Sequence, residues 1–229
     1  MLKDNPEQKK NRLKDVQSEQ DGRNIPLKHV GIKHLRWPLV LRARQKGEQH
    51  TVATVSLAVD LPRDLRGTHM SRFVQCLQKL EIVHPSAMEQ VLDDLKESLQ
   101  ADRAFLQLEF PYFIEKKAPV SGLTSLMDLN CVYTMEKGER FSLKVKVRVP
   151  IQTLCPCSKE ISDFGAHNQR AVASMEIEAN EFVWLEELAE IADGGASAPV
   201  YGLLKRPDEK FVTEQAYDNP RLLQNAGYH

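Results

Sequence analysis

The chain has 229 residues, 41% of them hydrophobic, which is enough for a sizeable core without covalent cross-links. Its 31 basic and 32 acidic residues give a formal net charge of −1, which argues against a broad basic surface for nucleic acid or an anionic membrane. No apolar run approaches the roughly 20 residues of a membrane span, and no secretion signal opens the chain. We therefore expect a cytoplasmic protein with free thiols and no nucleic-acid or membrane partner.

The first half of the chain alternates between strand and helix patterns. Residues 1–24 are polar and without sustained periodicity, which predicts a mobile tail. The alternation that begins at His50 (HTVATVSLAVDL) predicts a strand, and helical spacing follows from about Ser71. A second helix is predicted from Ser86, which would form a capping box with Glu89. The segment AFLQLEFPYFIEK then predicts another strand.

The second half repeats this theme. Strands are predicted at 126–135, 141–149 and 171–177, and helices at about 182–191 and from near Pro207. Strand pairs that alternate with helix pairs predict an α+β chain built from two related units. We place these units at 25–120 and 121–229.

The most chemically loaded stretch is LCPCSKEISDFGAHNQR, residues 154–170. The thiol of Cys155 and the imidazole of His167 both suit zinc and similar divalent metals, and an added carboxylate would extend the choice to manganese. A closed structural zinc site would need a second close pair of ligands, so an open catalytic site is the better metal interpretation. The alternative is that Cys155 and Cys157 are small residues in a loop that ends a strand, and that His167 is a surface histidine.

Several charged residues are further candidates. Lys159, Arg170, Lys205 and Arg206 can each donate charge-assisted hydrogen bonds to a phosphorylated substrate, although single basic residues are equally typical of a solvated surface. Glu209 in KRPDEK is a candidate functional acid, or a residue that stabilises the first turn of a helix.

Five segments in order carry a closer resemblance: RNIPLKHVGIKHLRWP, HTVATVSLAVDLP, GTHMSRF, CPCSKEISDFGAHNQR and YGLLKRPDEKFVTEQAYDNP. Over residues 23–220 the chain resembles the type IB GTP cyclohydrolase I family. The resemblance implies a tunnelling fold, in which antiparallel sheets carry helix pairs, with two such units per chain and a homotetramer. It also implies hydrolysis of GTP to 7,8-dihydroneopterin triphosphate and formate, the first step of tetrahydrofolate biosynthesis, with zinc or manganese as the metal.

The resemblance also implies roles for individual residues. Cys155, His167 and Glu209 would bind the metal, and Cys155 and His167 would serve in catalysis. A metal-activated water would attack C8 of the guanine ring while a general acid protonates the ring nitrogen. Cys157 would be structural or would support its neighbour.

The resemblance does not assign the residues that bind the triphosphate, and its C-terminal motif has no counterpart in this sequence. Lys159, Arg170 and Lys205 are our candidates for binding the triphosphate. The family continues beyond AYDNP into an ENFESIHNH-like motif that carries another metal-binding histidine and a glutamate that holds the guanine. This chain ends at NAGYH, and His229 lacks that motif's flanking sequence, so we expect a second unit that is incomplete relative to the family.

Two other functions remain open at this point. One is a non-catalytic metal-binding or oligomeric protein, a truncated homologue of the enzyme. The other is a tunnelling-fold nitrile reductase, which would use a cysteine as a covalent nucleophile, although the sequence has no ESKSxK-like motif.

Overall fold

The computed structural model describes residues 25–44, 46–63 and 68–221, so the predicted tail at 1–24 and His229 lie outside the described residues. The described elements follow one another as β1 (Leu27–Ala43), β2 (Gly47–Leu61), α1 (Met70–Leu77), β3 (Ile82–Val83), α2 (Pro85–Leu99), β4 (Ala104–Lys117), β5 (Thr124–Lys137), β6 (Phe141–Leu154), α3 (Pro156–Ile161), β7 (Asn168–Glu178), α4 (Leu185–Gly195), β8 (Ala198–Pro199) and α5 (Arg206–Asp218). This confirms the predicted α+β class. No helix among the described residues is long and apolar enough to span a membrane.

One sheet runs through the molecule in the order β3-β1-β2-β4-β5-β6-β7, and β8 pairs with β6. Its pairs are antiparallel except for β1 with β3. Strands β4 and β5 pair along their whole length, from Ala104 opposite Lys137 to Lys117 opposite Thr124. The sheet is therefore continuous across the boundary between the two predicted units, whose division into 25–120 and 121–229 stays a prediction.

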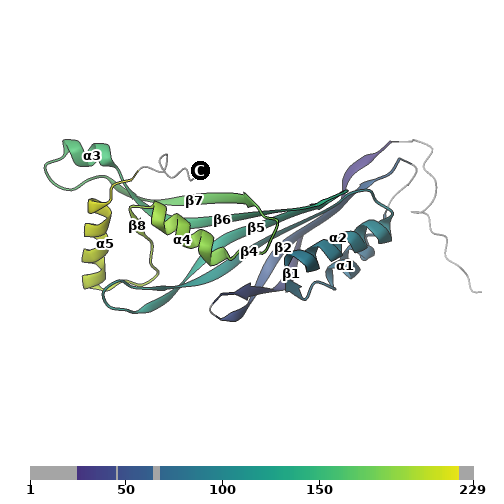
Figure 1. Cartoon of the computed structure of the whole chain (residues 1–229), viewed down its shortest axis with the longest axis horizontal. Coiled ribbons are helices and arrows are strands. Elements are labelled where there is room, and N and C mark those ends of the chain that lie inside the picture. The colour runs from purple at the N-terminus through teal and green to yellow at the C-terminus, as the bar shows by residue number, and fades with distance from the viewer. Residues whose placement is uncertain (1–24, 45, 64–67, 222–229) are drawn as a thin grey trace, which may run out of the picture.

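The core lies between one face of the sheet and helices α1, α2 and α4 (Figure 1). Alternate residues of β4 from Ala104 to Ile114 are buried, whereas the intervening ones, such as Gln107 and Glu109, are exposed. Phe73 of α1 and Leu95 of α2 are fully buried against this face. Each such side chain contributes about 1.5–3 kcal/mol through the hydrophobic effect. Burial of one sheet face thus fixes which side of the sheet carries the helices.

Helix α2 begins differently from the prediction. Its N-cap is His84, whose ring accepts the N–H of Ser86 at 3.4 Å, and Pro85 occupies the first helical position. The side chain of Glu89 forms an ion pair with Lys137 of β5 instead of returning to the helix end. The predicted capping box between Ser86 and Glu89 is therefore wrong, because the helix is capped two residues earlier, by the imidazole of His84, which accepts the Ser86 N–H.

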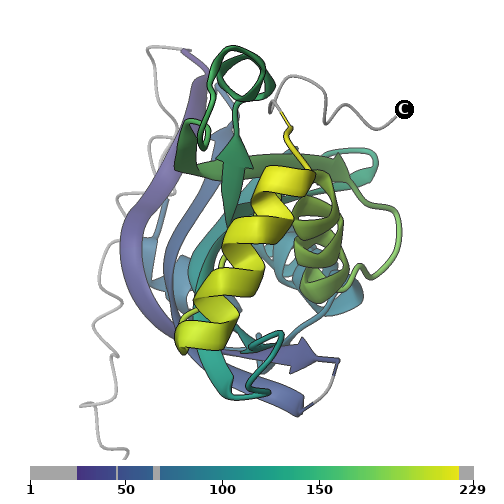
Figure 2. The ribbon, with the colours of Figure 1, turned by 90° about the vertical axis from the view of Figure 1, so that its left-hand side faces the viewer.

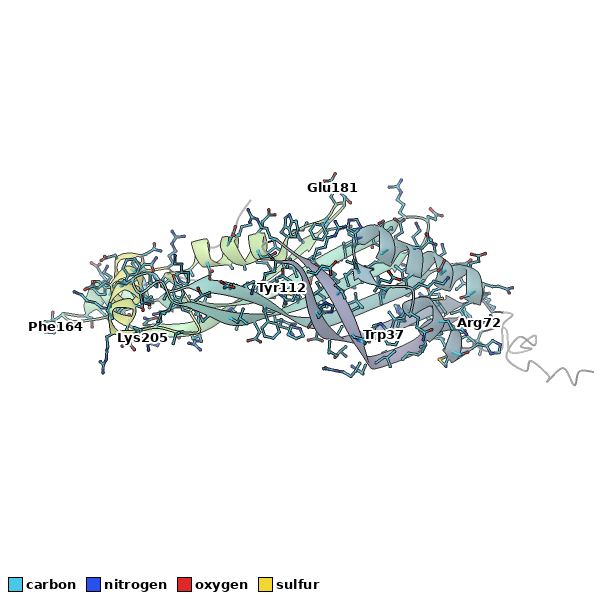
Figure 3. All side chains as sticks on the ribbon, turned by 90° about the horizontal axis from the view of Figure 1, so that it is seen from below. Trp37, Arg72, Tyr112, Phe164, Glu181 and Lys205 are labelled. Carbon is cyan, nitrogen blue, oxygen red and sulfur yellow. The ribbon has the colours of Figure 1, made fainter. Side chains whose placement is uncertain are left out.

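Helix α5 closes one end of the sheet (Figure 2). Figure 3 shows Lys205, at the start of α5, and Phe164, in the loop after α3, at this same end of the molecule. The chemistry-bearing segment predicted from the sequence, residues 154–170, therefore lies beside α5 and far from α1 and α2 (Figure 1).

Candidate metal and substrate site

Strands β6 and β7 bring the two predicted metal ligands to the same end of a hairpin. The two strands pair from Lys144 opposite Glu178 to Leu154 opposite Asn168. Cys155 follows this last pair directly and His167 precedes it directly, and the Cys155 N–H donates to the His167 carbonyl at 2.9 Å. The hairpin register therefore makes the two residues neighbours across the strands, although eleven residues separate them in the sequence.

The hydroxyl of Ser158 fixes the loop between them. It donates to the Cys155 carbonyl at 3.0 Å and accepts the His167 N–H at 2.7 Å. Gly165 turns the chain back at φ +72, a left-handed conformation that glycine adopts at little cost. Ser158 is thus a supporting residue of the site, one turn after Cys155, that the sequence patterns did not single out.

The surroundings of Cys155 favour its thiolate form. Cys155 is the N-cap of α3 and is partly exposed, and both it and the exposed Cys157 are free thiols. The backbone N–H of Ser158 lowers the pKa of the Cys155 thiol, against a smaller opposing effect of burial. Because the thiolate is the form that binds metal, this position suits a metal ligand.

The third predicted ligand, Glu209, does not join this pair within the chain. It is exposed in the first turn of α5, eight positions before Tyr217, which corresponds to about 12 Å along the helix axis. Tyr217 is the residue near the hairpin, since its carbonyl accepts the Lys159 ammonium and its ring lies 4.0 Å from the Lys159 Nζ. Within residues 25–44, 46–63 and 68–221, no three His, Cys, Asp or Glu side chains gather closely enough to hold a metal ion. The thiol and imidazole fit a divalent cation, but the described residues of a single chain do not supply the expected third donor beside them.

Asp208 explains why α5 holds this position. The side chain is fully buried, and it accepts the N–H groups of Val120 at 2.9 Å, Ser121 at 2.8 Å and Lys205 at 2.9 Å. Burial raises the pKa of the Asp208 carboxyl, but these N–H groups outweigh it and hold the pKa well below its usual range. Asp208 thus fastens the start of α5 to the loop between β4 and β5. The acid at the third helical position of KRPDEK was a readable signal for this cap.

The three basic candidates occupy different surroundings. Arg170 lies in β7 opposite Gln152 and lines a cavity of about 300 Å³ together with Asn168, the neighbour of His167. Lys205 is exposed at the N-cap of α5, and Lys159 is bound to the end of α5. Tyr201, Leu204 and Val212 also line this cavity. The structure thus places one of the three basic candidates in a cavity beside the Cys155–His167 pair.

The chain is similar in sequence to known proteins over most of its length. A sequence model described as type I GTP cyclohydrolase folE2 matches residues 13–225. Proteins named GTP cyclohydrolase FolE2 are 54% identical over 213 residues in Thermotoga sp. (strain RQ2), which covers 93% of this chain and 82% of the relative, and 50% identical over 215 residues in Thermosipho africanus (strain TCF52B), which covers 93% and 83%. Among solved structures, uricase from Arthrobacter globiformis superposes with a TM-score of 0.42 at 8% identity, over 83% of this chain and 76% of that chain.

Proposed function

Since the chain belongs to the type I GTP cyclohydrolase FolE2 family, we propose that it hydrolyses GTP to 7,8-dihydroneopterin triphosphate and formate in tetrahydrofolate biosynthesis. The observation that carries this proposal is the Cys155–His167 pair, which the β6–β7 register and Ser158 hold at one loop beside a cavity. Within the family we assign the chain to type IB, and we place it in the cytoplasm.

The proposed chemistry divides between the metal and the chain. A divalent cation, zinc or manganese, held by Cys155 and His167 would lower the pKa of a water molecule and supply the nucleophile for C8 of guanine. His167 is exposed beside the cavity, where an imidazole can also pass a proton to the ring nitrogen as the C–N bond opens. Hydrolysis of the resulting formamide releases formate, after which the ring closes to the pterin.

Arg170 is the proposed main contact of the triphosphate, with Lys159 and Lys205 in supporting positions. Arg170 lines the cavity, and its guanidinium can donate two parallel hydrogen bonds to a phosphate. The Lys159 ammonium donates a hydrogen bond to the Tyr217 carbonyl, so a phosphate would have to compete with that carbonyl for it.

We propose that Glu209 completes the ligand set from another copy of the chain in a homotetramer. Moving Glu209 to Cys155 within one chain would break the three hydrogen bonds of its neighbour Asp208. Two apolar side chains between Cys155 and His167 are highly exposed: Ile161 at 87% and Phe164 at 94%. Such exposure is typical of a surface that another protein covers. A neighbouring copy can therefore supply the carboxylate without disturbing α5.

The activity is tested with purified protein, GTP and either Zn²⁺ or Mn²⁺. We expect formate and, after oxidation, a fluorescent pterin; absence of both products with either metal would overturn the proposed function. The variant Cys155→Ala should lose at least a hundredfold in turnover, whereas Cys157→Ala, at an exposed thiol of the same loop, should keep most of it. Unchanged turnover in Cys155→Ala would remove the metal-ligand assignment.

The origin of Glu209 is tested by mixing Cys155→Ala and Glu209→Ala proteins under conditions that exchange subunits. If Cys155 and Glu209 of different chains share a site, a random mixture restores both residues in one half times one half of the sites, or about a quarter of wild-type activity. No recovery from proteins shown to have exchanged would place both residues in one chain.

One alternative has an observation in its favour. Because the described residues of a single chain contain no three-ligand cluster, a metal-binding protein without catalysis is the second candidate. Stoichiometric binding of Zn²⁺ or Mn²⁺ without pterin formation would support it over the cyclohydrolase.

A further inference from the structure

A second cavity, of about 280 Å³, lies between α4, the end of β4 and the β1–β2 hairpin. Its lining includes Tyr112, Ile114, Lys116, Glu186, Ala189 and Asp193, and it excludes Cys155, His167 and Glu209. Tyr112, which marks it, lies near the middle of the molecule, whereas Lys205 marks the end beside α5 (Figure 3). We propose that this cavity binds a small planar organic cation, a single ring that carries an amidinium or a protonated amine.

The cavity is built into the sheet by a fork between two strands. Backbone pairing of β2 with β4 stops at Thr54 opposite Glu109, and Pro111, two residues later on β4, has no N–H to continue it. Beyond this point the side-chain amide of Gln49 takes over: it donates to the Phe113 carbonyl at 2.8 Å and accepts the Phe113 N–H at 2.7 Å. Because the Gln49 side chain replaces a direct backbone hydrogen bond here, β2 and β4 are held apart. The two Gln49–Phe113 hydrogen bonds fix the space between the strands.

Glu186 gives the cavity an uncompensated negative charge. Its Oε1 accepts the Tyr112 hydroxyl at 2.6 Å and the Arg44 backbone N–H at 2.9 Å, both neutral donors. Its Oε2 is buried without a hydrogen-bond partner in the described part of the chain, where Glu186 also forms no ion pair. Glu186 lies in the first turn of α4, at the positive end of the helix dipole. A carboxylate with a buried oxygen that lacks a hydrogen-bond partner favours a ligand that brings a positive charge and an N–H donor.

Five of the other six charged side chains that line the cavity form ion pairs, and Glu190 does so with Arg44 at 3.3 Å. Lys116, only 8% exposed, lies 2.6 Å from Asp193, and Lys46 lies 3.0 Å from Glu115. Lys117 is exposed to solvent. These groups add little net potential, so the charge preference of the cavity follows Glu186.

The remaining walls select for a flat ring. Ala43, Ile114, Ala189 and Pro199 supply apolar surface, and the rings of Tyr112 and Tyr201 supply aromatic surface. The volume is close to the lower end, roughly 300 Å³, of small-molecule sites in proteins, which suits one ring better than a nucleotide. Shape and charge together therefore point to a compact aromatic cation.

The test uses benzamidine as the cation, with benzamide and benzoate as its neutral and anionic counterparts, on the wild-type protein without GTP. In a ¹H–¹⁵N NMR titration we expect benzamidine to shift the amides of residues 112–117 and 186–193 in a saturable manner. Benzamide should bind at least tenfold more weakly, and benzoate should not bind. Equal binding of benzoate, no saturable shift, or shifts confined to other residues would each overturn the proposal.

Two variants isolate the charge of Glu186. Glu186→Gln keeps an acceptor for Tyr112 and Arg44 but removes the charge, and should weaken benzamidine binding at least tenfold. Glu187→Gln changes the neighbouring exposed acid, which does not line the cavity, and should leave binding unchanged. A folded Glu186→Gln protein with wild-type affinity would contradict the assignment, and if that variant does not fold, the three wild-type titrations decide. None of these readouts depends on GTP turnover, so their failure is distinct from failure of the proposed enzyme function.

Discussion

Replacing Ser158 by alanine would remove a hydroxyl that ties the backbone of Cys155 to that of His167. The hydroxyl makes two hydrogen bonds, of 3.0 and 2.7 Å, to backbone groups of the proposed metal ligands. Each is worth about 0.5–1.5 kcal/mol net, because water can replace a lost partner at this partly exposed position. The loop would therefore lose about 1–3 kcal/mol of preference for its metal-binding arrangement, a factor of about 5–150 in the equilibrium.

We expect this loss to appear as a metal affinity reduced by about 5- to 150-fold, a span that includes the roughly 10- to 100-fold losses typical of changes to groups that support metal ligands. The assay is competition for Zn²⁺ between the protein and a chelating dye, with GTP turnover followed over a range of metal concentrations. Turnover should recover substantially at saturating metal, because Cys155 and His167 are both still present.

Two controls accompany Ser158→Ala. Ser158→Thr keeps a hydroxyl and should restore most of the affinity, whereas Ser162→Ala, at an exposed serine of the same loop, should change little. A Ser158→Ala protein with wild-type metal affinity and turnover would refute the reasoning that the hydroxyl positions the two ligands.

Three further predictions concern stability and reactivity. Asp208→Asn should lower the melting temperature at pH 7, and the gap between the melting temperatures of the variant and the wild type should shrink below about pH 4. The folded-state pKa of Asp208 lies below its unfolded value, so its contribution to stability is complete above the unfolded pKa and is lost as the pH falls. An unchanged gap at low pH would contradict this role. Leu95→Ala, at a fully buried position of α2, should cost about 2–5 kcal/mol in denaturant unfolding, and a cost below 1 kcal/mol would mean that the site collapses around the cavity. Burial raises the pKa of Cys131 to about 12, so iodoacetamide at pH 8 should label Cys155 and spare Cys131 in the folded protein, with equal labelling counting against that burial.

Periodicity predicted most of the elements that carry the core, because each buries one face. In β4 the buried residues alternate with exposed ones, and in α2 Val91, Leu95 and Leu99 recur at helical spacing. Both patterns follow from the burial of one face. Strand β1 escaped prediction, since two register shifts interrupt its alternation and His29 and His34 adopt positive φ there. Helix α3 also escaped, because it buries none of its six residues and so has no amphipathic signal.

The site shows the same division between local and long-range information. Cys155 and His167 could be paired from the sequence because they flank the turn of a single hairpin, whose register is set by alternating residues on both strands. Lys159 shows the limit: its hydrogen bond to the Tyr217 carbonyl on α5 joins segments far apart in the sequence, and no local pattern indicates it.

The position of Glu209 depends on a contact between segments that lie far apart in the sequence. Asp208 binds the loop at Val120 and Ser121, and this sets where α5 begins and therefore which end of α5 meets the hairpin. Asp208 holds the start of α5, and the contact of Tyr217 with Lys159 holds its end. The carboxylate that the family resemblance predicts can then reach Cys155 only through a rearrangement of these contacts or through a second chain. The second route keeps every hydrogen bond described here, which is why we assign the completion of the metal site to assembly.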